Sequence, residues 1–188
     1  ALTKNANIAD KDIYVPVMTQ GVMLAYKSGV KASDANVEIP FNPAFTAFEF
    51  DIKGGAETDL TITAVEITST STALSGDFTA TCTDGTWSYA AASDAAQSVK
   101  VTLPEGTKVN SSTNLVFDIF ALPQTLKDLK VIFHTNEGTK SLGLGRHTSS
   151  GGATTYTPLE FAACKKHKIN GLILPSGWYF SYITLDLQ

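Results

Sequence analysis

The chain contains little charge and almost no arginine. Charged residues make up only 17% of its 188 residues, Arg146 is the single arginine, and 18 acidic residues stand against 14 Lys and Arg. Nucleic-acid binding relies on a surplus of Lys and Arg that displaces counterions from phosphates, and arginine supplies the bidentate contacts. The composition therefore argues against nucleic acid as a partner.

Cysteine is also scarce, and long apolar runs are absent. No apolar stretch approaches the roughly 20 residues of a membrane-spanning helix. Cys82 and Cys164 allow at most one disulfide, and their spacing matches no metal or redox motif. Two interpretations stay open for these cysteines, either buried free thiols or a single bridge.

Helical periodicity is almost absent as well, whereas apolar and polar residues alternate along most of the chain. In residues 48–52 the apolar side chains fall on one face and the acids on the other, and residues 99–103 follow the same pattern. Residues 115–120 are apolar on both faces apart from Asp118, which is typical of a central strand. Because seven or more such segments occur, the sequence predicts an all-β fold, an antiparallel β-sandwich.

Turn residues separate several of these segments. Asp84-Gly85 lies between two alternating runs and predicts a two-residue hairpin, because both positions tolerate positive φ. Residues 136–138 (NEG) predict a second hairpin, with the glycine in the left-handed conformation.

Three further segments interrupt the simple pattern. The apolar phase slips by one residue at Ala64-Val65, which predicts a β-bulge that keeps both halves of the strand facing the core. Residues 145–157 are rich in Gly, Ser and Thr and predict a mobile loop. A single helical turn is predicted at residues 124–128.

Motifs of catalysis and cofactor binding are missing. No Gly-x-Ser-x-Gly segment offers a hydrolase nucleophile, and residues 143–145 (GLG) begin like a dinucleotide-binding loop that lacks its third glycine. The three histidines lack the i, i+2 or i, i+4 spacing of paired metal ligands, and we expect surface positions on strands or loops for His134, His147 and His167. The sequence predicts neither a metal nor a cofactor.

Carboxylates are the remaining candidates for catalysis, because sandwich folds host glycosidases that use two acids. Glu49 and Asp51 share one strand face, about 7 Å apart from strand rise alone. An ordinary solvent-facing strand produces the same spacing. Asp118 lies in an apolar strand, where a raised pKa or a backbone hydrogen bond would explain it. Asp10 and Asp12 lack further oxygen ligands for calcium, and we predict that the protein is not an enzyme.

Aromatic residues allow two interpretations. They form a sugar-stacking platform, or they pack in the core and dock the last strand. The residues concerned are Trp87, Tyr89, Trp178, Tyr179 and Tyr182.

Several motifs follow one another in a set order from Val37 onward. They are residues 37–50 (VEIPFNPAFTAFEF), 65–69 (VEITS), 76–78 (GDF), 85–87 (GTW), 120–125 (FALPQT), 129–133 and 161–172 (FAACKKHKINGL). This order resembles the fimbrillin-like family of type V pilins and cell-adhesion proteins of Bacteroides and related Bacteroidetes. The resemblance covers about residues 37–175.

The chain departs from that family in two ways. Cys164 stands where the family has Gly and His167 where it has Tyr. Family members also commonly carry two β-sandwich domains, and this chain has room for one. We expect residues 1–36 to form an N-terminal extension used in assembly and residues 37–188 a fimbrillin-like β-sandwich of transthyretin-like, Greek-key order, a fragment of a two-domain protein or a shortened subunit.

The resemblance implies a structural subunit of surface fimbriae or a cell-surface adhesin without an enzymatic site or cofactor. Such proteins are made as lipoprotein precursors, and the chain begins Ala1-Leu2-Thr3, so we expect a signal or lipoprotein segment that this chain lacks. The implied location is the outer membrane and the extracellular surface, in a fimbrium. The implied partners are other pilin subunits and a host or bacterial surface protein or glycan.

Assembly in this family proceeds by strand exchange, in which an extended segment pairs with an open sheet edge. The β-prone apolar ends of the chain are the candidates for this role, and their alternative is an ordinary edge strand. The candidate residues are Ile13, Tyr14, Val15, Val17, Phe180, Tyr182, Ile183 and Leu185.

A carbohydrate-binding module of a surface glycan-utilisation protein is the rival function. It requires an exposed, coplanar pair of aromatic side chains from Trp87, Tyr89, Trp178 and Tyr179.

Overall fold

Every regular element in the described part of the chain is a β-strand. The computed structural model describes residues 2–4, 11–16 and 21–186, and within these ranges it has no helix, and so none long enough to cross a membrane. The predicted all-β class is confirmed, whereas the helical turn predicted at residues 124–128 is wrong. Leu126 is fully buried and exchanges two backbone hydrogen bonds with Phe161, which holds this segment extended.

The strands fall into two main sheets and three two-stranded ribbons. Their bounds are β1 (Leu2–Lys4), β2 (Lys11–Pro16), β3 (Met23–Ala25), β4 (Phe41–Pro43), β5 (Thr46–Gly54), β6 (Leu60–Thr68), β7 (Phe78–Thr83), β8 (Thr86–Ala91), β9 (Ser98–Thr102), β10 (Lys108–Val109), β11 (Asn114–Ala121), β12 (Lys130–Thr135), β13 (Gly138–Gly143), β14 (Gly145–Ser150), β15 (Ala153–Pro158), β16 (Lys165–Leu174) and β17 (Gly177–Asp186).

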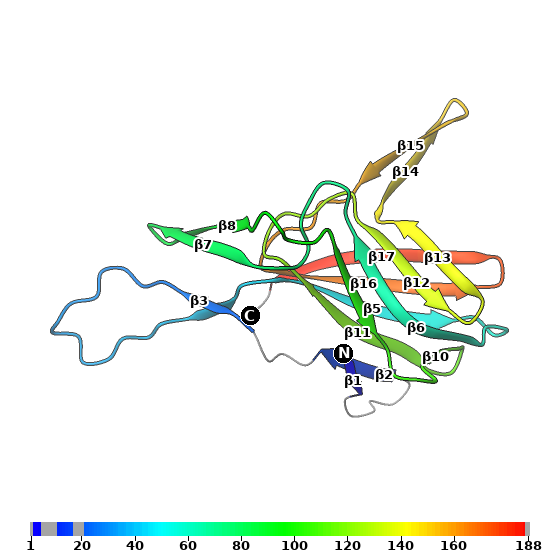
Figure 1. Cartoon of the computed structure of the whole chain (residues 1–188), viewed down its shortest axis with the longest axis horizontal. Coiled ribbons are helices and arrows are strands. Elements are labelled where there is room, and N and C mark those ends of the chain that lie inside the picture. Colours follow the sequence, from blue (N-terminus) through cyan, green and yellow to red (C-terminus); the bar gives the residue numbers. More distant parts are fainter. Residues whose placement is uncertain (1, 5–10, 17–20, 187–188) are drawn as a thin grey trace.

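The larger sheet has six strands in the order β1-β2-β11-β5-β16-β17 (Figure 1). Its pairs are antiparallel except for β2 with β11 and β5 with β16, which are parallel. The predicted central strand at residues 115–120 falls in β11, and it has neighbours on both sides. Leu115, Phe117 and Ile119 face the core, whereas Asp118 and Phe120 on the opposite face are only half-buried.

The smaller sheet has the order β10-β6-β12-β13, with β9 also paired to β6. Its strand β6 carries the irregularity that the phase slip predicts. His134 of β12 pairs with Ala64, but the next residue, Thr135, pairs with Ile62, so Thr63 is left over. Ala64 and Val65 are both buried, which confirms a bulge that keeps both halves of β6 in the core.

The two sheets share one apolar core. Phe50 of β5 stacks on Phe117 of β11, with ring centroids 5.0 Å apart. Across the core, Phe50 meets Phe133 of β12 edge to face at 6.4 Å. Contacts of this kind join the two sheets through interlocking aromatic and aliphatic side chains. The predicted sandwich with Greek-key, transthyretin-like order stays a prediction.

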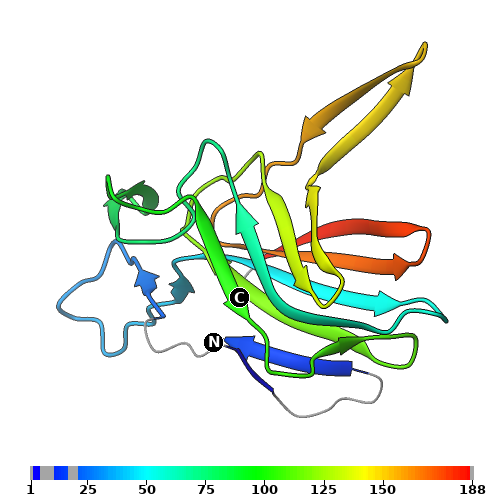
Figure 2. The same cartoon turned by 45° about the vertical axis from the view of Figure 1, so that its right-hand side comes forward.

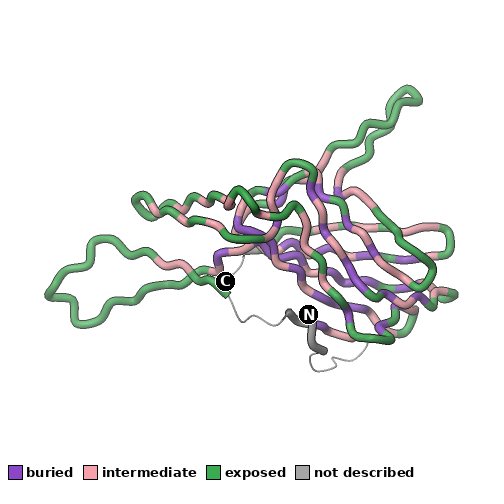
Figure 3. Tube along the Cα trace, in the orientation of Figure 1, coloured by how far each residue is buried: buried purple, intermediate pink, exposed green. Residues whose placement is uncertain are grey.

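The three ribbons project from this body, and most of their residues are exposed (Figures 2 and 3). The β7–β8 hairpin confirms the predicted turn, because Asp84 and Gly85 have φ of 48° and 85°. The β12–β13 hairpin is confirmed as well, and Gly138 has φ of 103°.

The mobile loop predicted at residues 145–157 is wrong. The segment forms the paired strands β14 and β15, joined at Gly151 and Gly152 with φ of 59° and 82°. The two glycines supply the positive φ of the turn, and the β-branched threonines on either side favour strands. Neither face of this hairpin is buried, so its sequence lacks the alternating apolar residues from which a strand is predicted.

The β3–β4 ribbon, here named the arm, comprises residues 21–43. Its strands pair only at residues 23–25 and 41–43, and a turn between Lys31 and Asp34 lies at its far end. The arm crosses the predicted boundary between residues 36 and 37. The division into an extension and a domain stays a prediction.

Candidate functional site

The N-terminal candidate segment lies inside the larger sheet. Ile13 and Tyr14 of β2 pair in parallel with Val116 and Phe117 of β11. Tyr14 is buried, and its hydroxyl accepts a 3.4 Å hydrogen bond from Thr107. The backbone of the candidate Val15 pairs with β1. The last candidate in this segment, Val17, lies outside the described residues.

The C-terminal candidate segment forms the edge strand β17. Phe180 and Tyr182 point toward the core and pack partly buried against it. Ile183 and Leu185 are exposed, at 51% and 47% of their surface. Both terminal segments therefore lie in the chain's own sheet, and their role in strand exchange stays a prediction.

An apolar groove opens between two sheet edges, at β13 and β17. It has a volume of about 620 Å³. Buried side chains form its floor, among them Leu144, Phe161 and Ile169. Aromatic side chains of β17 form one wall, and the end of β13 with the start of β14 forms the other. Within the described residues, β13 pairs only with β12 and β17 only with β16, so each edge strand has backbone groups free for a further strand.

The three candidate carboxylates lie on the outer face of the larger sheet, and two of them, Glu49 and Asp51, belong to an ion-pair network. Glu49 contacts Lys166, and Lys168 Nζ lies 3.3 Å from Glu49 Oε1 and 3.6 Å from Asp51 Oδ2. Burial raises the pKa of Glu49, but the hydrogen bonds and charges of the two lysines outweigh it and leave the pKa lowered. Lys168 reaches both acids, which supports the prediction that they share one strand face.

Asp118 of β11 is the third candidate acid. It pairs across the strands with Glu49. Burial raises the pKa of Asp118; Lys166 opposes this effect and Glu49 adds to it. Its Oδ1 is buried without a hydrogen-bond partner in the described part of the chain. The expected backbone hydrogen bond is therefore missing at this atom.

The histidines lie in three separate environments. The predicted surface position is wrong for His167, which is 1% exposed and packs 4.8 Å from the ring of Phe161. Burial lowers the pKa of His167. His134 approaches Glu66 at 3.6 Å, and His147 lies beside Tyr156. Among the residues described, no group of three or more His, Cys, Asp and Glu is placed to hold a metal ion.

The two cysteines are free and half-buried. Cys164 Sγ lies 3.2 Å from the hydroxyl of Tyr89, which brings the β7–β8 hairpin against the start of β16. Burial raises the pKa of Tyr89, and its contact with the thiol adds to the rise. Of the two open interpretations, the structure therefore supports free thiols.

The candidate aromatic residues do not gather in one platform. Trp178 packs 5.0 Å from Phe133 in the core, whereas Tyr179 is 54% exposed on the other face of β17. Trp87 and Tyr89 lie on the separate β7–β8 hairpin. The core-packing interpretation therefore fits Trp178.

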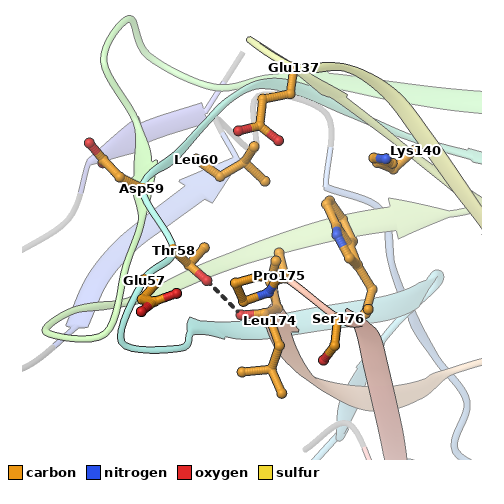
Figure 4. Close-up of a pocket in the computed structure, with 12 residues that line it drawn as sticks. Glu57, Thr58, Asp59, Leu60, Glu137, Lys140, Leu174, Pro175 and Ser176 are labelled. Atoms are coloured by element: carbon orange, nitrogen blue, oxygen red, sulfur yellow. Dashed lines mark hydrogen bonds between the residues drawn. The ribbon is translucent and has the colours of Figure 1, made fainter.

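A second pocket, of about 500 Å³, lies at one end of the molecule (Figure 4). Glu57, Glu137, Lys140 and Trp178 line it, and so does Asp59, whose carboxylate is ion-paired with Lys108 at 3.0 Å. The hydroxyl of Thr58 donates a 3.0 Å hydrogen bond to the carbonyl of Ile173, which ties the β5–β6 loop to the end of β16. Neither this pocket nor the groove was predicted, because both combine segments far apart in the sequence.

The chain is similar to one protein family and to several solved structures. The fimbrillin-like family profile matches residues 17–173. A protein assigned to cell adhesion from Bacteroides uniformis matches with 14% identity, a TM-score of 0.47, and coverage of 85% of this chain and 57% of its own. A fimbrial protein from Bacteroides vulgatus matches with 14% identity, a TM-score of 0.44, and coverage of 80% and 56%. No curated protein matches.

A further structure, of a protein assigned to cell adhesion from Bacteroides ovatus, matches with 12% identity, a TM-score of 0.43, and coverage of 81% of this chain and 48% of its own. The chain thus spans about half the length of these solved proteins. The family match, which covers most of the sequence, is the stronger finding.

Proposed function

The chain belongs to the fimbrillin-like family, and from this premise we propose that it is a structural subunit of surface fimbriae or a cell-surface adhesin. The observation that carries the proposal is the apolar groove between two edge strands with free backbone groups. An extended segment of another subunit would pair with either edge and place alternate side chains in the groove.

Assembly by strand addition or exchange is the mechanism that we propose. The terminal segments supply the strands, and their candidate residues are Ile13, Tyr14, Val15, Val17, Phe180, Tyr182, Ile183 and Leu185. In exchange, such a segment leaves its own sheet and enters that of a neighbour. The partners are other pilin subunits, and an adhesin would also contact a surface protein or glycan.

The remaining parts of the proposal concern the whole protein. Residues 1–36 serve assembly and residues 37–188 form a Greek-key β-sandwich of the two packed sheets. A second domain completes the subunit. The protein reaches the outer membrane as a lipoprotein precursor, acts at the cell surface and carries out no catalysis.

The test compares two deletions by light scattering and electron microscopy of the purified protein, with and without limited proteolysis. We expect the intact chain to form oligomers or filaments, and removal of residues 178–186 to reduce them. The matched control removes residues 149–154, the exposed tip of the β14–β15 hairpin, which does not line the groove. A chain that stays monomeric under every processing condition contradicts the proposal.

Glycan binding is the second candidate, and the pocket in Figure 4 favours it because acidic residues and Trp178 line it together. Trp178 is the aromatic residue shared by this pocket and the groove. Titration with a panel of glycans should then quench the fluorescence of Trp178, and the variant Trp87→Phe isolates that signal. Unchanged emission across the panel removes this candidate.

A further inference from the structure

The arm carries an unusual concentration of exposed apolar side chains. Twelve large hydrophobic side chains are exposed among the described residues, and seven of them lie on the arm: Val22, Met23, Tyr26, Val30, Val37, Ile39 and Phe41. Folded proteins rarely leave a contiguous apolar surface of this kind without a partner. Figure 3 shows the arm extending away from the body, with most of its length exposed.

One segment of the arm has the pattern of an inserting strand. Val37, Ile39 and Phe41 are exposed at 39%, 47% and 62%, and they alternate with Glu38 and Pro40. In an extended chain this alternation places all three apolar side chains on one face. Pro40 lacks a backbone donor on the edge that it shares with Glu38, so the edge of Val37, Ile39 and Phe41 is the one able to donate to a neighbouring strand.

The groove between β13 and β17 is complementary to this segment in length and polarity. Five extended residues span about 16 Å, which matches the stretch of β17 from Trp178 to Tyr182 along the groove. The floor of the groove is apolar. Such a floor suits three aliphatic and aromatic side chains that leave water together.

Charge at the rim is complementary as well. Arg146, the single arginine, is exposed beside the groove. Glu38 is exposed on the arm, and neither residue has an ion-pair partner in the described part of the chain. A docked arm that points its apolar face inward directs Glu38 toward the rim, where Arg146 can meet it.

A chain cannot fill its own groove with its own arm. The arm extends from one side of the body, whereas β13 and the hairpin between β16 and β17 lie toward the other side in both views (Figures 1 and 2). The occupant must therefore come from a second copy.

We propose that the arm of one copy docks in the β13–β17 groove of a second copy, with Val37, Ile39 and Phe41 in the groove and Glu38 against Arg146. This inference rests on the proposed subunit function and names a further segment and acceptor for it. The contact joins two different surfaces, so repetition generates a head-to-tail chain rather than a closed pair.

The test uses a peptide of residues 35–43 (ANVEIPFNP), which contains no tryptophan. The receptor is the full chain with Trp87→Phe, so that Trp178 at the groove is the only tryptophan, and with Ile39→Ser and Phe41→Ser, so that its own arm does not compete. We expect saturable binding with a change in the emission of Trp178. A control peptide with Ser at positions 39 and 41 should bind at least about tenfold more weakly.

Two further variants locate the contact. Arg146→Glu in the receptor should weaken binding of the peptide, and the matched control Lys53→Glu, at an exposed position of β5, a strand that does not line the groove, should not. Equal binding of the two peptides, or no change in the emission of Trp178, overturns the inference.

The outcome also separates this inference from the proposed function. If subunits assemble while the peptide leaves Trp178 unchanged, the arm contact is wrong and the subunit function stands. If the peptide binds as expected while the chain never assembles, the pairwise contact stands and the fimbrial function is wrong.

Discussion

His167 Nδ1 lies 3.1 Å from the hydroxyl oxygen of Thr184, and the two residues face each other across β16 and β17. The other ring nitrogen, Nε2, lies 3.3 Å from the carbonyl oxygen of Ala162. A carbonyl only accepts, so the neutral ring satisfies both contacts when Nε2 carries the hydrogen and Thr184 donates to Nδ1. The edge strand β17 is thus held to the sheet by a buried neutral histidine.

Stability should depend on pH through His167. Burial lowers its pKa below the ordinary 6.5, so the folded protein binds fewer protons than the unfolded chain. The stabilisation is present above about pH 6.5 and is lost as the pH falls toward the folded pKa. Denaturant unfolding at pH 7.5 and 5.5 should show this loss, and His167→Asn should reduce it.

The exposed His147 provides the control for that measurement. His147→Asn should leave the difference between pH 7.5 and 5.5 unchanged. If His167→Asn and the unmodified chain lose the same free energy of unfolding on acidification, the assignment of the effect to His167 is wrong.

Asp118→Asn should stabilise the protein at neutral pH. Burial raises the pKa of Asp118, so this acid contributes its stability below the ordinary value of 3.8 and loses it as the pH rises through the folded pKa. The uncharged amide should therefore raise the denaturation midpoint at pH 7, and the gain should shrink in acid. Asp94→Asn, at an exposed position, should change little. A lower midpoint for Asp118→Asn at pH 7 would contradict this prediction.

Phe133→Ala should destabilise the protein by about 3–5 kcal/mol, the usual cost of removing a buried ring. Phe133 joins the two sheets through Phe50 and also contacts Trp178 and Phe180. The free energy of unfolding in urea measures the loss, and Phe133→Leu should lose less because it keeps most of the buried surface. A loss below about 1 kcal/mol for the alanine variant would show that this inter-sheet contact is not needed.

Gly171→Val should destabilise the junction of β16 and β17. A Cβ at Gly171 would lie 2.7 Å from the ring of Phe180, its partner across the two strands. Overpacking of this kind costs about 1–3 kcal/mol. Thermal unfolding measures the effect, and the added change Phe180→Leu should recover part of it. Equal destabilisation in the single and double variants would locate the strain elsewhere.

The local pattern of the sequence predicts single strands and turns well. Alternation identified β5 and β9, a run that is apolar on both faces identified β11, and Asp84-Gly85 identified its hairpin, because neighbouring residues decide these features. Alternation also predicts an inward position for His167, because in β16 it lies on the same strand face as the buried Ile169 and Ile173. Its polarity suggested a surface position, yet two hydrogen bonds satisfy it in the core.

No local sequence pattern predicts the groove or the exposure of the arm. Leu142 and Trp178 line it together although they belong to different sheets, and their proximity depends on how the sheets pack. The exposure of the arm could not be predicted either. Alternation in residues 37–41 predicts a strand, but it does not show which surface covers that strand. Terminal segments were predicted as candidates for pairing, and their placement in the chain's own sheet depends on contacts across the sequence.

The parallel pairing of β5 with β16 also determines when the protein can fold. Thr46 and Ala162, which share a hydrogen bond at this junction, are 116 positions apart. During synthesis β5 emerges long before its neighbour exists, and closing so long a loop has a large entropic cost. The larger sheet is therefore completed only after nearly the whole chain has left the ribosome. A chain with this connectivity keeps its core open until β16 and β17 have been made.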